Sequence, residues 1–215
     1  MDHAVVFDVG ETLVCETRIW LRWAERLNIP AVTFAGVLGG CIAEGKTLEE
    51  TFEILVPGIS IPDEEARWAV DEPESLRSGF DADDLYPDVR PALEALQAAG
   101  FRVVIAGNQP AEALASLQAM DLPCDVIANS SEIGVEKPDP AFFSAVAELA
   151  GVERYRISYI GDRLDNDVFP AMRAGMRPFL IRRGPFGYMH AAGPDAFRTT
   201  VIDSLMELPE ILTHP

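Results

Sequence analysis

Short apolar segments recur along the chain and predict the strands of a sheet. Five of them are strong and a sixth, near the C-terminus, is weaker. They lie at Ala4–Phe7, Arg102–Ala106, Val126–Ala128, Ile157–Ile160, Pro178–Ile181 and Thr200–Ile202. Helical patterns lie between or after them, at Arg90–Ala99, Ala111–Met120, Pro140–Ala150, Asn166–Ala174 and Leu205–Leu212. Strands that alternate with helices of about ten residues predict βαβ units, and therefore a parallel sheet with helices on both faces.

The segment from residue 16 to residue 84 departs from this alternation. It contains no convincing buried strand, and its helical stretches are separated by prolines and a Pro-Gly pair. These stretches are Thr17–Leu27, Leu48–Leu55 and Asp63–Val70. We therefore expect a core domain made of residues 1–15 and 85–215, with a helical domain of residues 16–84 inserted after the first strand. Residues 182–187, after the last strong strand, are expected to form a loop.

Charge excludes several classes of partner. The formal net charge is −18, and only two of the 17 basic residues, Lys46 and Lys137, are lysines. Such an acidic chain repels nucleic acids and anionic lipids, so neither is an expected partner. A small anionic substrate would need local positive charge from a metal ion or a well-placed lysine. Oligomeric state is left open between monomer and homodimer.

Cysteine usage and the N-terminus indicate the cytoplasm. The three cysteines are widely spaced and form no Cys-x-x-Cys pair, which fits a reducing compartment. No signal peptide is visible, and the longest uncharged stretch, residues 29–43, is too short and too rich in glycine to span a bilayer.

Acidic residues follow the first and fourth predicted strands. Asp8 ends the run Val5-Val6-Phe7, and Asp162 ends Tyr159-Ile160-Gly161, with Asp167 one turn further on. The carboxyl ends of strands in an open α/β sheet face the ligand crevice. Carboxylates that converge there repel one another unless a cation lies between them, and hard oxygen ligands suit Mg²⁺. The alternative is that these residues only cap turns and helix starts.

Two further segments carry candidate chemistry. Gly107 and Asn108 follow the second strand and open a helix, where exposed N–H groups favour a bound anion, although an ordinary turn would look the same. Lys137 precedes Pro138, and a lone lysine in a chain that otherwise uses arginine suggests a need for a compact ammonium group rather than a planar guanidinium group. The alternative is an ordinary surface lysine in a loop.

The order of these four segments resembles the haloacid dehalogenase (HAD) superfamily, whose four motifs occur in this order on a Rossmann-like sheet. The resemblance covers nearly the whole chain and includes a helical cap of the C1 type, inserted between the first and second motifs. It implies an α/β fold: a Rossmann-like parallel sheet with helices on both faces, plus an inserted all-helical cap.

The resemblance also implies roles for individual residues. Asp8 matches the nucleophile that forms an aspartyl-phosphate, and Thr12 matches the threonine that braces its loop. Asn108 falls where the family places a backbone donor against the transferred group. Lys137 matches the lysine that neutralises charge on the nucleophile and the phosphoryl oxygens. Asp8, Asp162, Asp167 and the carbonyl group of Gly10 would hold Mg²⁺.

Two positions depart from the family pattern. Family phosphatases usually read Asp-x-Asp-Gly-Thr, and the second Asp, which protonates the leaving group, is here Gly10. A Ser or Thr that binds phosphate is here Gly107. Loss of a general acid lowers the rate by roughly 10²–10⁴-fold for a poor leaving group. Strand-like alternation points Glu11 away from Asp8, so it is a weak substitute.

These departures leave several functions open. The first is a Mg²⁺-dependent phosphatase for small metabolites with good leaving groups, and the second is a weakened HAD fold kept as a sensor or interaction module. Dehalogenases also lack the second Asp, but they usually end their fourth motif differently. Phosphonatases use a cap lysine, and Lys46 could take that role or bind substrate. The neighbouring Glu44, however, would raise the pKa of Lys46, and Thr47 reads as a helix N-cap with Glu50.

Overall fold

A computed structural model describes residues 2–213, so that Met1 and residues 214–215 of the expected core range lie outside the described residues. The chain divides into two compact units. One unit consists of residues 1–15 and 85–215, and the other of residues 16–84. The larger unit carries the sheet, and the smaller unit is helical.

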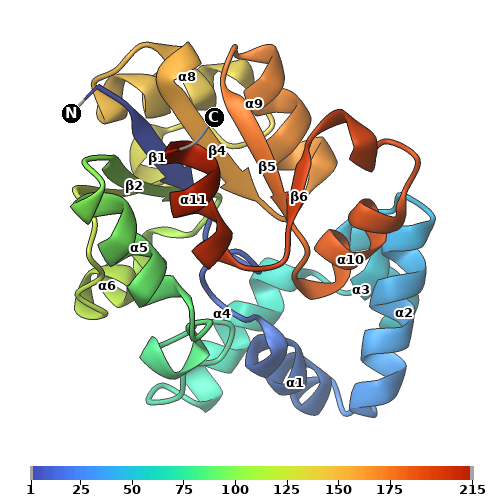
Figure 1. The fold of residues 1–215 in the computed structure, drawn as a ribbon. Coiled ribbons are helices and arrows are strands. Elements are labelled where there is room, and N and C mark those ends of the chain that lie inside the picture. Colours follow the sequence, from blue (N-terminus) through green and yellow to red (C-terminus); the bar gives the residue numbers. More distant parts are fainter. Residues whose placement is uncertain (1, 214–215) are drawn as a thin grey trace. The chain divides into compact units, whose positions relative to one another are not determined.

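The larger unit is built on six parallel strands in the order β3-β2-β1-β4-β5-β6 (Figure 1). This confirms the predicted α/β class. The strands are β1 (Ala4–Phe7), β2 (Arg102–Gly107), β3 (Val126–Asn129), β4 (Ile157–Gly161), β5 (Arg177–Ile181) and β6 (Thr200–Ile202). All four residues of β1 are buried, as expected for a strand covered on both faces.

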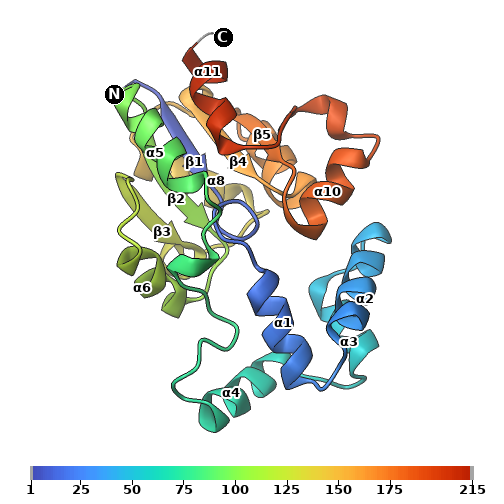
Figure 2. The same ribbon diagram turned by 60° about the horizontal axis from the view of Figure 1, so that its bottom comes forward.

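Helices cover both faces of this sheet (Figure 2). Alternate strand residues such as Val6, Val104 and Tyr159 pack against Phe143 and Val146 of α8, and the opposite face is covered by α5 together with α11. The helices of this unit are α5 (Val89–Ala98), α6 (Ala111–Ala119), α7 (Ser130–Ile133), α8 (Pro140–Ala150), α9 (Phe169–Arg173), α10 (Gly184–Ala192) and α11 (Leu208–Thr213).

The strand order places a topological switch point beside β1. The chain moves outward from β1 to β2 and β3, and then returns to place β4 on the other side of β1. Ligands of open α/β sheets bind at the carboxyl ends of the strands that flank such a point. Asp8 follows β1 and Asp162 follows β4, so both acids emerge there.

The smaller unit consists of four helices around an aromatic core. Trp23 makes edge-to-face contacts with Phe52 and Trp68, and Trp20 stacks on Phe34. The helices are α1 (Thr17–Arg26), α2 (Ala31–Ala43), α3 (Leu48–Leu55) and α4 (Ile61–Asp71). Among the described residues no single helix has the length and apolarity to cross a membrane; α1 and α2 meet these criteria only together, as a pair bent by 115°.

Three segments differ from the sequence-based expectations. α2 was not predicted as a helix, because its 13 residues carry no charge and include three glycines, so they show no alternation of polar and apolar faces. Residues 184–192 form α10 where residues 182–187 were expected to be a loop, since a proline is tolerated in the first turn of a helix. The predicted helix Asn166–Ala174 is a π-helical turn, Leu164–Val168, followed by α9.

Candidate active site

Asp8 lies at the first residue after β1, where the ladder with β4 ends. Its backbone N–H donates to the carbonyl oxygen of Ile160 at 2.9 Å, and only 7% of the residue is exposed. The chain then turns back sharply, because the N–H groups of Leu13 and Val14 both donate to the carbonyl oxygen of Val9 at 2.9 Å. The sheet therefore fixes the backbone that carries the Asp8 carboxylate.

Lys137 connects two of the carboxylates. Its Nζ lies 2.6 Å from Oδ1 of Asp8 and 2.6 Å from Oδ1 of Asp167, and its side chain is 1% exposed. Asn108 holds the backbone of this lysine in a reciprocal pair of hydrogen bonds: its Nδ2 donates to the Lys137 carbonyl at 2.9 Å, and its Oδ1 accepts from the Lys137 N–H at 2.8 Å. The side chain of Asn108 therefore positions the lysine.

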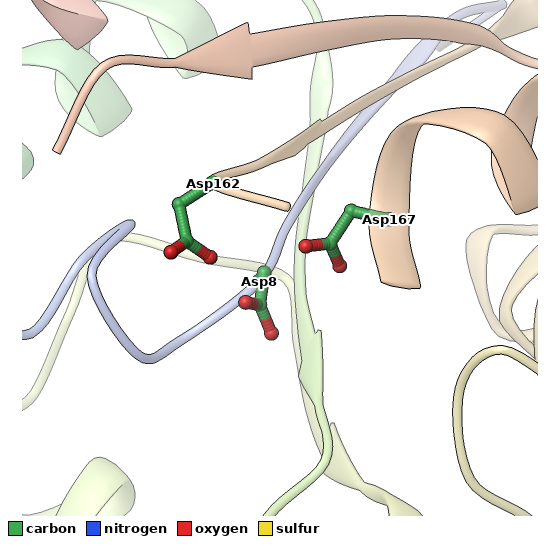
Figure 3. Close-up of side chains that lie close together, drawn as sticks. All are labelled: Asp8, Asp162 and Asp167. Atoms are coloured by element: carbon green, nitrogen blue, oxygen red, sulfur yellow. The ribbon is translucent and has the colours of Figure 1, made fainter. Parts of the chain in front are cut away.

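Asp8, Asp162 and Asp167 form a buried acidic cluster (Figure 3). One carboxylate oxygen from each lies within 4.8 Å of the others, and Figure 3 shows the three side chains converging from separate segments. Asp167 is fully buried and its Oδ2 accepts from the N–H of Arg163 at 3.1 Å. Lys137 thus pairs with two of the three clustered carboxylates.

The electrostatics follow from burial and from these contacts. Burial alone would lower the pKa of Lys137, but the carboxylates of Asp167 and Asp8 raise it well above its ordinary value. Burial raises the pKa of Asp167 to about 6, because the opposing effect of Lys137 is incomplete and Asp8 adds like charge. Lys137 is therefore a permanent cation, whereas the cluster carries more negative charge than this cation neutralises.

The cluster fits a divalent metal ion on the evidence of its donors. Buried carboxylates require compensating positive charge, and Lys137 contributes one such charge to a cluster of three. Hard oxygen donors with few protein ligands are what Mg²⁺ and similar cations take. Asp8, Asp162 and Asp167 would hold such an ion, and the carbonyl group of Gly10, two residues after Asp8, was predicted as a fourth ligand.

Two glycines allow side chains to approach closely. A Cβ atom on Gly107 would lie 2.6 Å from Oδ1 of Asp8 and 3.3 Å from the backbone nitrogen of Val9. A Cβ atom on Gly161 would overlap with the side chain of Asp167. Gly107 was predicted as a substrate-binding position, whereas the need for Gly161 was not recognised from the sequence.

Thr12 and Lys46 complete the predicted set. Thr12 is fully buried, and its hydroxyl group has no hydrogen-bond partner among the described residues. Lys46 belongs to the other unit, where its Nζ pairs with Oε2 of Glu44 at 2.5 Å. This hydrogen bond raises the pKa of Lys46, as expected from the sequence, and Thr47 and Glu50 form the predicted capping box.

Sequence reasoning missed Tyr159, Tyr86 and Arg183 near the cluster, and it considered Glu11 only as a weak substitute acid. The hydroxyl group of Tyr159 lies 3.5 Å from Oδ1 of Asp167, and burial raises the pKa of this tyrosine well above its ordinary value. Tyr86 and Arg183 contact the loop that follows Asp8, at the side chain of Glu11 and at the carbonyl oxygen of Thr12, and they pack against each other. Arg183 lies in a segment expected to be a loop, yet it is only 7% exposed. No local motif marks Tyr86 or Arg183.

Comparisons with known proteins agree with the geometry. A sequence model of haloacid dehalogenase-like hydrolases matches residues 3–175. The glyceraldehyde 3-phosphate phosphatase of Methanopyrus kandleri is 31% identical, over 99% of this chain and 97% of that protein. The phosphoglycolate phosphatase of Nitrosospira multiformis is 31% identical, over 59% of this chain and 56% of that protein.

Solved structures give the same fold. The HAD-hydrolase YfnB from Bacillus subtilis, in a crystal structure bound to magnesium, superposes with a TM-score of 0.70 at 22% identity, and the match covers 98% of each chain. A dehalogenase in complex with an intermediate superposes with a TM-score of 0.65 at 20% identity, over 98% of this chain and 96% of that chain. At this level of identity the two likenesses bear on the fold alone.

Proposed function

Since the chain belongs to the haloacid dehalogenase-like hydrolase family and has phosphatase-like relatives, we propose that it is a Mg²⁺-dependent phosphatase that uses Asp8 as its nucleophile. The observation that supports this most is the contact between Lys137 Nζ and one oxygen of Asp8, with Asp167 on the same ammonium group and Asp162 in the same acidic cluster. Such an arrangement sets a positive charge against the Asp8 carboxylate at the switch point of the sheet. The substrate would be a small phosphorylated metabolite.

The reaction would proceed in two displacements. A carboxylate oxygen of Asp8 forms a bond to phosphorus while the bond between phosphorus and the leaving group breaks. Water then attacks phosphorus, releases inorganic phosphate and regenerates the carboxylate. Lys137 stays charged throughout and offsets negative charge on Asp8 and on the phosphoryl oxygens. Bound Mg²⁺ would add a divalent positive charge against the phosphoryl group.

The substrate would need a good leaving group. Gly10 offers no acid. The carboxylate of Glu11 accepts a hydrogen bond of 2.5 Å from the hydroxyl group of Tyr86, so this carboxylate is held beside Tyr86. Without a proton donor, alkoxide departure slows by roughly 10²–10⁴-fold. Acyl and aryl phosphates leave as weakly basic anions, and we propose that they are the preferred class.

Recognition of the rest of the substrate would involve the helical unit. We propose that residues 16–84 act as a cap that selects the substrate, with Lys46 as one binding residue. Asn108 would offer its backbone N–H to the transferred group while its side chain holds Lys137. Relatives named for glyceraldehyde 3-phosphate and phosphoglycolate suggest small phosphorylated acids and aldehydes for a first panel.

The test is phosphate release from acetyl phosphate and p-nitrophenyl phosphate, with Mg²⁺ and with a chelator. Asp8→Asn should abolish Mg²⁺-dependent release. Asp165→Asn is the matched control, because Asp165 pairs with Arg163 and lies outside the acidic cluster; it should retain most activity. Equal activity of Asp8→Asn and the unsubstituted protein would show that Asp8 is not the nucleophile.

A second candidate is a phosphoryl-ligand sensor with negligible turnover. The two glycines at positions 10 and 107 favour it, since each stands where a family phosphatase carries a functional side chain. It predicts binding of Mg²⁺ and of a phosphate mimic such as aluminium fluoride, without hydrolysis across the panel. The Schiff-base chemistry of a phosphonatase is disfavoured, because the pair with Glu44 keeps Lys46 protonated.

A further inference from the structure

Glu11 has an unusual backbone conformation for its residue type. Its φ is 48°, in the left-handed region that favours glycine, although Gly10 beside it is not among the glycines of positive φ. The residue is also only 5% exposed. A buried acidic residue in a strained conformation persists only where its surroundings determine it. The contacts of its side chain therefore matter for the loop.

Tyr86 supplies one of these contacts. Its hydroxyl group donates to Oε2 of Glu11, and its backbone N–H donates to the carbonyl oxygen of Leu13 at 3.0 Å, so it holds the loop from both the side chain and the backbone. Burial, together with the carboxylate of Glu11, raises the pKa of Tyr86 well above its ordinary value, which keeps the proton on the tyrosine. Gly184 leaves the space that the side chain of Glu11 fills, because a Cβ atom there would overlap with it.

Arg183 supplies the other contacts. Its NH1 donates to the carbonyl oxygen of Thr12 at 2.7 Å, and its guanidinium carbon lies 4.2 Å from the centre of the Tyr86 ring. Its NH2 pairs with the carboxylate of Asp88. Asp88 is held in turn by the hydroxyl group of Ser204 at 2.6 Å. The arginine is thus fixed between a carboxylate, a ring and the backbone of the loop.

We propose that Tyr86 and Arg183 are positioning residues: by holding the side chain of Glu11 and the carbonyl oxygen of Thr12, they brace the loop of residues 9–14 and so set the direction of the Asp8 carboxylate. Their importance for turnover rests on the proposed function. The brace supports the loop where the backbone is strained, one residue after Gly10, whose carbonyl group was predicted as a metal ligand. Without it, the loop would relax toward ordinary φ values and Asp8 would lose its alignment with Lys137.

Amide hydrogen exchange tests the brace directly. The variants are Arg183→Met, which keeps bulk over the Tyr86 ring, and Tyr86→Phe, which removes only the hydroxyl group. The N–H groups of Glu11, Leu13 and Val14 are hydrogen-bonded within the loop and should exchange at least about tenfold faster in both variants. This readout does not depend on turnover, so it tests the brace even if the protein proves not to be a phosphatase.

Neighbouring residues provide matched controls. Arg182 makes a two-point pair with Asp203 and lies 5.7 Å from the centre of the Tyr188 ring, so Arg182→Met removes comparable contacts on the exposed side. Tyr155→Phe removes an exposed tyrosine hydroxyl group. Neither control should change exchange in residues 9–14.

Kinetics provide the second readout. With acetyl phosphate and Mg²⁺, kcat of Arg183→Met and Tyr86→Phe should fall by about 10–100-fold while KM changes by less than about threefold, since misplacement of a reacting group slows the chemical step. Tyr86→Phe and Glu11→Gln should be non-additive in the double variant. The proposal is overturned if residues 9–14 exchange no faster in Tyr86→Phe and Arg183→Met than in the controls. Faster exchange with unchanged kcat would also overturn the catalytic part.

Discussion

Glycines at the carboxyl end of the sheet are the most informative single residues of this protein. Gly107 lies so close to Asp8 that a side chain there would meet the carboxylate, whereas Gly10 has no conformational need to be glycine. Packing therefore accounts for Gly107. For Gly10 the important point, under the proposed function, is that glycine provides no proton donor.

Replacement of Gly107 by serine should reduce activity, although serine is the usual family residue. The new Cβ atom would lie 2.6 Å from Oδ1 of Asp8, the oxygen that Lys137 holds, so the carboxylate must turn away. We expect kcat for acetyl phosphate to fall by about tenfold or more. The control is Gly40→Ser, where a Cβ atom meets nothing within 4 Å. A rise in kcat would mean that the carboxylate moves without cost.

Gly10→Asp should restore a general acid. Its effect should depend on the leaving group: roughly 10²-fold or more in kcat/KM for an alkyl phosphate such as glycerol phosphate, and much less for p-nitrophenyl phosphate. Gly10→Asn has nearly the same size and cannot donate in this way, so it should give no gain. Equal effects of Gly10→Asp and Gly10→Asn would contradict the role of the new carboxyl group as a proton donor.

At the level of elements, β-strands were predicted more accurately than helices. β1 and β6 have the predicted bounds, and β1 is a continuous apolar run. α2 and α10 could not be predicted, since α2 is apolar on all sides and α10 begins with Gly-Pro. Their helicity depends on tertiary packing, for example of Phe34 in α2 against Phe52, and no local pattern reveals such packing.

The capping box of α3 gives a measurable prediction. Thr47→Ala removes the hydroxyl oxygen that accepts from the N–H of Glu50 at 3.2 Å, and should lower the free energy of unfolding of the helical unit by about 1 kcal/mol. All three tryptophans of the chain lie in this unit, so tryptophan fluorescence during urea unfolding reports on it. Thr33→Ala, at an exposed position of α2, is the control and should change little. No difference between the two variants would contradict the capping role.

For the molecule as a whole, the sequence indicated which strand ends carry the acids but not what supports them. The motif pattern was sufficient to group Asp8 with Asp162, because both follow strands that flank the switch point, and the structure brings their oxygens within 4.8 Å. Arg183 reaches Thr12 across 171 residues of sequence, and Tyr86 reaches Glu11 across 75. Such contacts depend on how the loops pack, which a single sequence does not reveal.

Asp88 should contribute to acid sensitivity. Burial would raise its pKa, but hydrogen bonds from Arg183 and Ser204 lower it below the ordinary value. Because the pKa of Asp88 is lower in the folded protein, the unfolded chain binds more protons between the folded and unfolded pKa values. The stabilisation is therefore present above about pH 4, and it is lost as the pH falls through the folded-state pKa. Asp88→Asn should cost about 1–3 kcal/mol at pH 7 and progressively less below pH 4, measured by urea unfolding at each pH. A pH-independent difference would exclude this account.

Metal binding should reverse the effect of one substitution, Asp162→Asn, on the melting temperature. Without Mg²⁺, Asp162→Asn should melt a few degrees higher than the unsubstituted protein, because it removes one of three clustered carboxylates. With Mg²⁺ at about 100 times its Kd, the unsubstituted protein should gain about 2.7 kcal/mol, and the order of melting temperatures should reverse. Calorimetry in Mg²⁺ and in EDTA measures both. The same order in both solutions would exclude metal binding by this cluster.

The left-handed backbone at Glu11 also has an evolutionary consequence. Glycine would relieve the strain at this position, yet it would remove the acceptor for the hydroxyl group of Tyr86. A change from Gly10-Glu11 to the common Asp-Gly pair therefore takes two substitutions. One adds an acid at position 10 and the other removes the acceptor for Tyr86, so their effects on the loop differ. An acid at position 10 is thus gained by one substitution, whereas the exchange of Glu11 also removes a contact of Tyr86.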